Sequence, residues 1–167
     1  NAQTTMKNAF GIAIYFPGDS SGYESPYDSL NYSKDFLWAS MVKDFWKSIN
    51  DGVKSQICLW PHHFDNSFKW FSGRKIDDGD EQMGIGFSCG DETYELPYVY
   101  LSLWPALRKT NTLAIPEGAY LHDSEWTGLL LPYEAIIEKK DIESQSALVT
   151  GFMNESFAGI KRGFSKR

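Results

Sequence analysis

The stretch SKDFLWASMVKDFWKSIN, residues 33–50, does most to decide the fold class. Its apolar residues recur at intervals of three and four, which is typical of an amphipathic helix. Ser33 has the side chain of a helix N-cap, and Asp35 complements the helix dipole in the first turn. Asp51 and Gly52 then predict the end of the helix. The apolar residues with this spacing are Leu37, Trp38, Met41, Val42, Phe45, Trp46 and Ile49.

Strands rather than helices are predicted for the middle of the chain. Several short apolar runs there are bounded by turn-forming residues, as strands usually are. These runs cover residues 56–60, 68–71, 83–88, 98–104 and 127–131. We expect loops between them, at GRKIDDGDEQ, at CGDETYELP and along residues 105–125. A last helix is predicted for residues 143–162, where one stripe contains Val149, Phe152, Met153, Phe157 and Ile160.

This order of elements predicts an α+β fold. Strands grouped between two terminal helices, without strict βαβ alternation, favour a largely antiparallel sheet flanked by an N-terminal and a C-terminal amphipathic helix. The run AFGIAIYF, residues 9–16, adds a buried strand closed by the turn PGDSSG. The 167 residues fit one domain over residues 1–167. We expect residues 1–8 to be a scar of a purification tag and a flexible N-terminus.

Composition excludes some partners and leaves others open. A formal charge of -6 makes nucleic acid an improbable partner, because neutralising phosphates takes a concentrated basic surface. No run approaches the roughly 20 apolar residues of a membrane span, so we expect no membrane insertion. The cytoplasm is favoured, although a targeting segment removed from a mature form would leave the same sequence. Cys58 and Cys89 match no metal spacing and are too few for a disulfide framework.

Two adjacent histidines and a carboxylate interrupt an apolar run in LWPHHFD, residues 59–65. Pro61 cannot donate to a sheet ladder, so a strand is expected to end or bulge there. Adjacent residues of an extended chain point to opposite faces, so His62 and His63 bind one metal only if the backbone turns. Asp65 either converges with His62 or orients one imidazole, as in metal and acid-base sites. The alternative is a buried histidine, hydrogen-bonded to Asp65, that only holds the turn.

A third histidine, His122, lies in YLHDSEW beside Asp123 and Glu125. Three histidines and nearby carboxylates are enough ligands for zinc or iron, although the sequence has no HExxH motif. His122 is equally compatible with an ordinary exposed loop. The glycines of MGIGFSCGD do not form a phosphate loop, because no helix and no lysine follow them, and close strand packing explains them better.

An arginine and an aromatic strand are further candidates. Arg74, nine residues beyond Asp65, either forms a salt bridge that holds the turn or binds a substrate carboxylate or phosphate. Glu95 precedes a strand along which Tyr98, Tyr100 and Trp104 alternate. Such an aromatic face suits a sugar or a flat ligand, and it equally suits packing against a helix.

The order of these motifs resembles that of an uncharacterised bacterial protein family with a WPHHFD core. That family also has a GxGxSPGD segment, an EPYxY strand ending in WP, and a WHxEGW stretch. Here WPHHFD is followed by GIGFSCGDE, ELPYVYLSLWP and AYLHDSEWTGLLLP, so the resemblance covers residues 51–164. The resemblance implies that certain polar residues recur throughout the family, and it implies no activity. These residues are His62, His63, Asp65, Asp91, Glu95, His122 and Glu125.

The chain departs from that family at two positions. Cys89 stands where the family pattern has proline, which puts the local turn in doubt, and Leu121 stands where tryptophan is usual. A second resemblance is local: residues 9–45, with their GIAIYFP run, are similar to the closing strand and helix of clostripain-type cysteine peptidases. This segment contains none of the catalytic motifs of those peptidases.

Two main functions follow from these residues. In the first, a divalent metal such as zinc or iron is bound by His62, His63 and His122, and a carboxylate orients a ligand or acts as a general base on metal-bound water. The catalytic set is then His62, His63, Asp65, Glu95 and Glu125. In the second, the HHFD turn is structural and an aromatic pocket binds a small organic molecule or a sugar. The ligand-binding set is Arg74, Asp91, Tyr98, Tyr100 and Trp104. A protein-interaction module is a third possibility.

Overall fold

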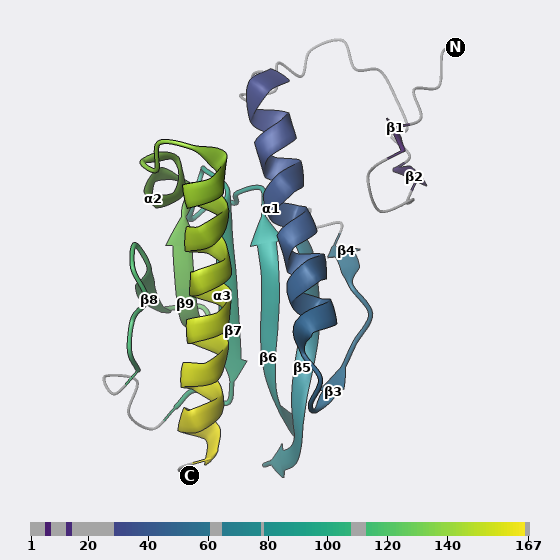
Figure 1. Cartoon of the computed structure of the whole chain (residues 1–167). Coiled ribbons are helices and arrows are strands. Elements are labelled where there is room, and N and C mark those ends of the chain that lie inside the picture. Colours follow the sequence, from purple (N-terminus) through teal and green to yellow (C-terminus); the bar gives the residue numbers. More distant parts are fainter. Residues whose placement is uncertain are drawn as a thin grey trace.

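The computed structural model of the chain describes residues 6–7, 13–14, 29–60, 65–77, 79–107 and 113–165, with side-chain environments from residue 37 onward. Two long helices, α1 (Ser29–Ser48) and α3 (Ile142–Ser165), lie side by side across one sheet (Figure 1). A short helix, α2 (Tyr133–Ile137), links the last strand to α3. In these ranges no helix is both long and apolar enough to cross a membrane.

The sheet contains seven strands, and all its pairings are antiparallel. The strand order is β3-β5-β6-β7-β9-β8, and β4 also pairs with β5. The predicted α+β class is therefore confirmed. The strands are β3 (Val53–Lys54), β4 (Cys58–Trp60), β5 (Asp65–Ile76), β6 (Gly79–Ser88), β7 (Tyr98–Trp104), β8 (Tyr120–Asp123) and β9 (Thr127–Pro132).

The N-terminal helix begins earlier than the sequence indicates. It starts at Ser29, so Ser33 lies inside the helix and is not its N-cap. The apolar spacing begins only at Leu37, and such a pattern cannot locate a start that lies two turns before it. Of the strand expected over residues 9–16, only β2 (Ala13–Ile14) is described, and it pairs with β1 (Met6–Lys7). The other residues of that stretch lie outside the described part of the chain.

Two segments expected to be loops contain strands. Strands β5 and β6 continue into GRKIDDGDEQ as a hairpin that turns at Asp77, where φ is 49°. Arg74, Lys75, Asp77 and Asp80 are exposed there, although Glu81 is buried, so the composition resembles that of a loop. The connection over residues 105–125 contains β8, which forms a hairpin with β9. Four residues are too few for alternation to reveal a strand.

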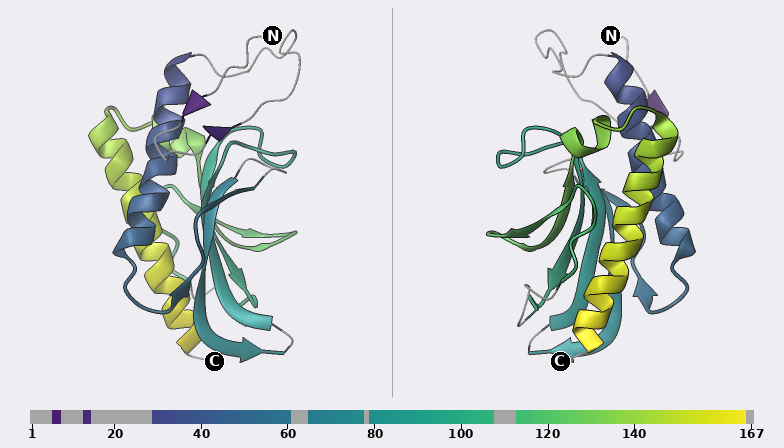
Figure 2. Two further views of the ribbon diagram at one scale, coloured as in Figure 1. Left: turned by 90° about the vertical axis from the view of Figure 1, so that its right-hand side faces the viewer. Right: turned by 60° about the vertical axis from the view of Figure 1, so that its left-hand side comes forward.

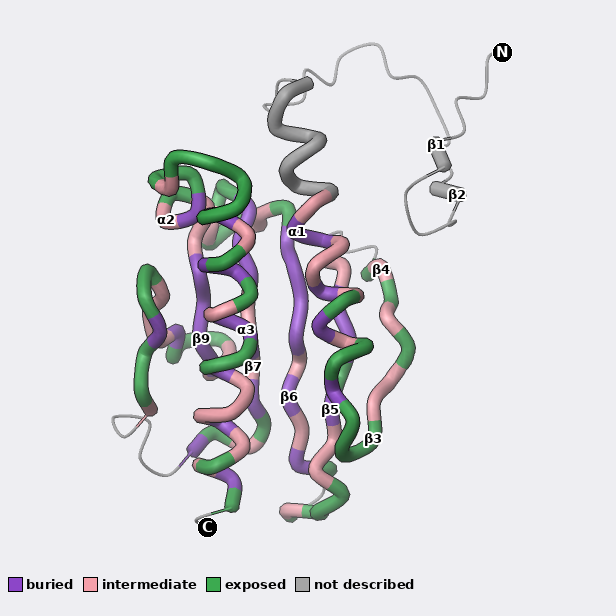
Figure 3. Tube along the Cα trace, in the orientation of Figure 1, coloured by how far each residue is buried: buried purple, intermediate pink, exposed green. Residues whose placement is uncertain are grey.

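The core lies between the helices and one face of the sheet. Figure 2 shows both long helices on the same side of the sheet. Figure 3 shows that β6, β7 and β9 are the most continuously buried strands. From α3, Val149, Phe152 and Met153 are at most 1% exposed. The buried strand residues of this face are Phe68, Trp70, Met83, Ile85, Phe87, Val99, Leu101, Leu103, Leu129 and Leu131.

Candidate functional site

The face of the sheet turned away from the helices has a different composition. Successive residues of a strand point to opposite faces, so the neighbours of the core residues belong to this open face. In β7 the core residues Val99 and Leu101 alternate with Tyr98 and Tyr100. Strand pairing extends this face from β5 to β8. Its other members include Asp65, Ser67, Gly84, Gly86, Ser88, Tyr120, His122 and Leu130.

Five aromatic rings form a closed circuit on the open face. Tyr94 lies 5.3 Å from Tyr98, and Tyr98 lies 5.9 Å from Tyr100, between ring centroids. Tyr100 lies 5.8 Å from Trp126, whose ring stacks on His122 at 4.1 Å. His122 closes the circuit at 5.7 Å from Tyr94. We call these five residues the aromatic circuit; such contacts add about 0.5–1.5 kcal/mol per pair beyond burial.

Two tyrosines of the aromatic circuit donate hydrogen bonds to aspartates. The Tyr98 hydroxyl donates to Asp91 Oδ2 at 2.5 Å, and the Tyr100 hydroxyl donates to Asp65 Oδ2 at 2.8 Å. Burial, reinforced by these aspartates, raises the pKa of both tyrosines far above the usual value of about 10. Both phenols therefore stay protonated donors at neutral pH.

Each of these tyrosines also has a serine partner. Ser88 acts on the Tyr98 hydroxyl, and Ser67 acts on the Tyr100 hydroxyl. Both serines lie on the open face, and both are buried. Each serine favours the phenolate and so lowers the pKa of its tyrosine, an effect that burial outweighs. Each tyrosine hydroxyl is therefore influenced by one serine and hydrogen-bonded to one aspartate.

A glycine leaves room for the hydrogen bond between Tyr100 and Asp65. Tyr100 reaches across β6 from β7 to Asp65 on β5, and Gly86 lies in the strand between them. A Cβ atom on Gly86 would come within 2.5 Å of Ser67 Cβ and 2.9 Å of the Tyr100 hydroxyl. The glycine of GIGF thus provides room for the tyrosine ring, in agreement with the close strand packing expected from the sequence.

His122 is buried and held at both ring nitrogens. Its Nδ1 is 2.7 Å from the Tyr94 hydroxyl, and its Nε2 is 3.0 Å from Ser124 Oγ. Ser124 donates its hydroxyl proton to Glu125, so it accepts from Nε2–H. Nδ1 is then the acceptor for Tyr94, and Tyr94 in turn raises the pKa of Tyr120. This network assigns the Nε2–H tautomer to His122.

Glu125 ends this network at the surface. Its side chain is 72% exposed, and Oε2 lies 3.6 Å from His122 Nε2. The hydrogen bond from Ser124 is the main reason why the Glu125 pKa is lowered. The carboxylate is therefore ionised at neutral pH, which places a negative charge at the rim of the aromatic circuit.

A turn between β6 and β7 places Tyr94 in the aromatic circuit. Asp91 Oδ1 accepts from the backbone N–H groups of Thr93 and Tyr94, each at 2.8 Å. The Asp91 N–H donates to the Tyr94 carbonyl at 2.7 Å and closes the turn. Asp91 therefore both positions Tyr94 and accepts from Tyr98. Cys89 precedes this turn as an exposed thiol.

Several residues singled out in the sequence come together here. The structure groups Asp65, Asp91, Tyr98, Tyr100, His122 and Glu125 at the aromatic circuit. Trp104 is on the same face but lies at the far end of β7, where its ring covers Gly79. Glu95 is exposed in the connection before β7. The tyrosines of β7 do not pack against a helix, because Val99, Leu101 and Leu103 take that place.

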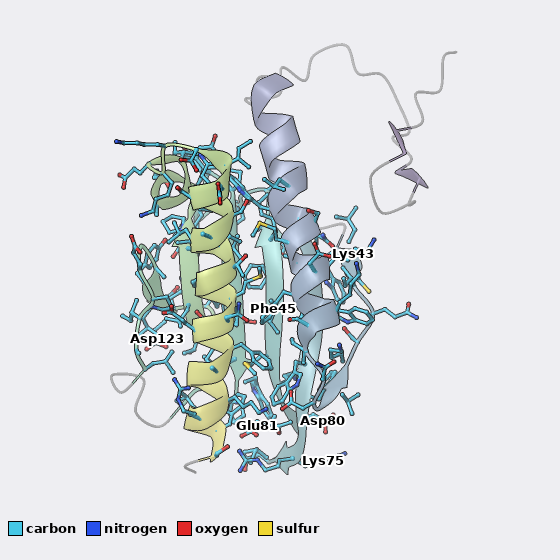
Figure 4. All side chains as sticks on the ribbon, in the orientation of Figure 1. Lys43, Phe45, Lys75, Asp80, Glu81 and Asp123 are labelled. Carbon is cyan, nitrogen blue, oxygen red and sulfur yellow. The ribbon has the colours of Figure 1, made fainter. Side chains whose placement is uncertain are left out.

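Arg74 has a different partner from the one expected. It forms a two-pronged salt bridge with Glu81 across the β5–β6 hairpin, at 2.9 and 2.8 Å, and does not pair with Asp65. Arg74 also donates to the carbonyl of Phe164 in the last turn of α3. Figure 4 shows Glu81 close to that end of α3. Since Glu81 is fully buried, this contact ties the hairpin to the helix and is a structural clamp.

Of the predicted metal ligands, His62 and His63 lie outside the described residues. Within the described ranges, no group of three or more His, Cys, Asp or Glu residues is arranged to hold a metal ion. His122 uses both ring nitrogens in hydrogen bonds to Tyr94 and Ser124. A metal at His122 would therefore have to displace one of these two partners.

Three aromatic members of the site were missed from sequence. Tyr94 follows Asp91 by three residues in GDETY, which is a turn signal of the Asx type that places its side chain. Tyr120 belongs to the unrecognised strand β8. Trp126 follows His122 by four residues around a tight hairpin, a proximity that could be inferred only once β8 and β9 are paired.

Comparisons of the chain with protein-family models, with curated proteins and with solved structures find no match. The resemblance to a family with a WPHHFD core therefore stays a prediction. A function can therefore be inferred only from the residues of the open face.

Proposed function

We propose that the chain binds a small organic ligand over the aromatic circuit. The observation that carries this proposal is the closed set of five rings on the sheet face that neither long helix covers. Ligand sites are usually largely preformed, with mostly apolar or aromatic walls and a few oriented polar groups. Tyr98 is 6% exposed, whereas Tyr94, Tyr100 and Trp126 are only partly buried.

Preorganisation supports the same proposal. Hydrogen bonds hold Tyr94, Tyr98 and Tyr100 at their hydroxyl ends, so little side-chain freedom remains to be lost on binding. The buried side chain of Leu130 lies on the same face, paired in register with Tyr100 and Tyr120. A fixed aromatic surface above an apolar strand is suited to a ligand that presents a flat or apolar side.

The experiment is a fragment screen of neutral, anionic and cationic compounds, followed by NMR of protein with labelled tyrosine and tryptophan rings. We expect a binding compound to shift resonances of Trp126 and the circuit tyrosines. The variant Trp126→Leu should lose the response, and Trp104→Leu, an exposed tryptophan away from the aromatic circuit, should retain it. A library that shifts no circuit resonance would overturn the proposal.

A metal-dependent enzyme is the second candidate. In its favour, Asp65 directly follows the HHF segment in the chain and lies on the same face as His122, connected through Tyr100 and Trp126. His62 and His63 would bring further imidazoles to zinc or iron. Elemental analysis of chelator-free protein checks this candidate, with His62→Ala and His122→Ala alongside. Stoichiometric metal that both substitutions remove would favour it over simple binding.

A further inference from the structure

The polar chemistry of the aromatic circuit narrows the class of ligand. The hydroxyl protons of Tyr98, Tyr100 and Tyr94 are donated to Asp91, Asp65 and His122. The Ser124 proton is donated to Glu125. Apart from the indole N–H of Trp126, the circuit thus offers few hydrogen-bond donors to a ligand. What it offers is the negative face of aromatic rings and the oxygen atoms of carboxylates.

Among the described residues, the charged side chains that act on the tyrosines and the histidine of the site are carboxylates. Asp65 and Asp91 accept from circuit tyrosines, and Glu125 lies at the His122 side. Asp65 and Asp91 also act electrostatically on Tyr98, and Glu134 acts on Tyr120. Ring faces and carboxylates both attract a cation, and together they disfavour an anion. The net charge of -6 adds to this preference.

Elsewhere the chain places its own cations over aromatic rings. Lys54 Nζ lies 4.4 Å from the ring centroid of Trp46, and Lys161 Nζ lies 5.9 Å from that of Trp70. In the described part of the chain, the lysines seen over rings are these two, and neither ring belongs to the aromatic circuit. The circuit therefore has ring faces that no described cation of the chain covers.

We propose that the ligand carries an alkyl-substituted ammonium group, which rests on the rings of Tyr100 and Trp126 within reach of Asp65 and Glu125. This inference rests on the proposed function, because it names the class of ligand for the same site. A substituted ammonium suits the site better than a sugar does. Its C–H groups contact rings without needing donors, and its charge matches the carboxylates.

The test compares choline with its neutral isostere 3,3-dimethylbutan-1-ol, in which carbon replaces the charged nitrogen. Methyl glucoside serves as the sugar probe. Each compound is titrated against ring-labelled protein while the resonances of the aromatic circuit are followed. We expect choline to bind at least about tenfold more tightly than either neutral probe, with saturable shifts of Tyr100 and Trp126.

Two variants separate charge from folding. Glu125→Gln removes a rim charge from an exposed side chain, so the fold should persist while choline affinity falls several-fold and affinity for the neutral isostere does not change. Trp126→Leu should abolish the response to choline, and Trp104→Leu should preserve it. A Glu125→Gln variant that binds choline as tightly as the wild type would count against the role of Glu125 and overturn the proposed position of the cation.

The remaining outcomes distinguish the two proposals. If the isostere or methyl glucoside shifts the same rings with equal or higher affinity, the ammonium inference is overturned and the proposed binding function stands. If choline and the neutral probes shift no circuit resonance, the ammonium inference is again overturned. The broader fragment screen then decides separately whether the aromatic circuit binds any ligand.

Discussion

The two faces of the sheet arise from the same strands but are stabilised in different ways. The helix side is apolar and almost fully excluded from water, as Val99, Leu101 and Leu129 illustrate. The open side consists of aromatic rings whose hydroxyl groups are hydrogen-bonded to acids, as in the pair Tyr100 and Asp65. Each residue of β7 belongs to one face or the other by a period of two. One strand can therefore build a core and a site at once.

The difference between the two faces indicates which residues mainly stabilise the fold and which are available to bind a ligand. Burying a large apolar side chain on the helix side stabilises the fold by about 1.5–3 kcal/mol. A hydrogen bond on the open side adds about 0.5–1.5 kcal/mol, because water competes for its partners in the unfolded chain. We therefore expect substitutions on the helix side to affect folding first, and substitutions on the open side to affect binding first.

The largest effect is expected for Phe152→Ala in α3. Phe152 is 1% exposed in the core, so its removal should lower the free energy of unfolding by about 3–5 kcal/mol. The matched change on the open face, Tyr100→Phe, should lower it by about 0.5–1.5 kcal/mol through the lost hydrogen bond to Asp65. Urea unfolding of both variants measures the difference. Equal losses would contradict the division between the two faces.

The next effect is expected at the clamp between Arg74 and Glu81. Arg74→Ala leaves the fully buried carboxylate of Glu81 without its arginine and should lower the free energy of unfolding by about 3 kcal/mol. Glu81→Leu in the same variant should recover much of this loss, because no buried charge then remains. Thermal and denaturant unfolding check both variants. A double variant as unstable as Arg74→Ala would show that the helix contact matters more than the buried charge.

Gly86→Ala tests the open face alone. The added methyl group meets Ser67 and Tyr100, so we expect a loss of about 1–3 kcal/mol and displacement of the Tyr100 ring. Gly151→Ala in α3 is the control, since a Cβ there would meet no atom within 4 Å beyond its chain neighbours and the backbone of its own helix. That change should stabilise the helix by about 0.5–1 kcal/mol. Unfolding curves and ring NMR distinguish the two, and an unshifted Tyr100 in the first variant would be inconsistent with the described geometry.

The last effect is expected only at alkaline pH. The pKa values of Tyr98, Tyr100 and Tyr120 are raised in the folded chain, mainly by burial. Unfolded tyrosines ionise near pH 10, so stability from these groups is complete below about pH 10 and declines as the pH rises further. The decline is at most about 1.4 kcal/mol per pH unit for each of Tyr98 and Tyr100, and it is smaller for the more exposed Tyr120. Phenolate absorbance and unfolding curves follow it, and Tyr98→Phe should give a shallower decline.

Local periodicity was enough to predict the α+β class and most of the elements. It found the helix containing Val42 and the strand from Tyr98 because these segments alternate between core and surface with a clear period. It missed β8, which has only four residues, and the true start of α1 at Ser29. Elements without a packed stripe of sufficient length leave no periodic signal.

The site was predicted less completely than the fold, because its contacts join distant parts of the chain. Asp65, Asp91 and His122 were selected for their chemistry, but their partners depend on strand register. Arg74 was paired with Asp65 on spacing alone, whereas the hairpin places Glu81 beside it. Pairing of β9 with both β7 and β8 brings Trp126 to Tyr100, and no local pattern encodes that neighbourhood.

The side-by-side position of α1 and α3 has a consequence for biosynthesis. Strands β5, β6 and β7 pair with their neighbours in the chain and can associate as soon as they leave the ribosome. The helix α3, which covers Leu101 and Leu129, is translated only after every strand of the sheet. A nascent chain that lacks α3 therefore exposes a broad apolar face. Such a surface is what chaperones bind and what aggregates in their absence.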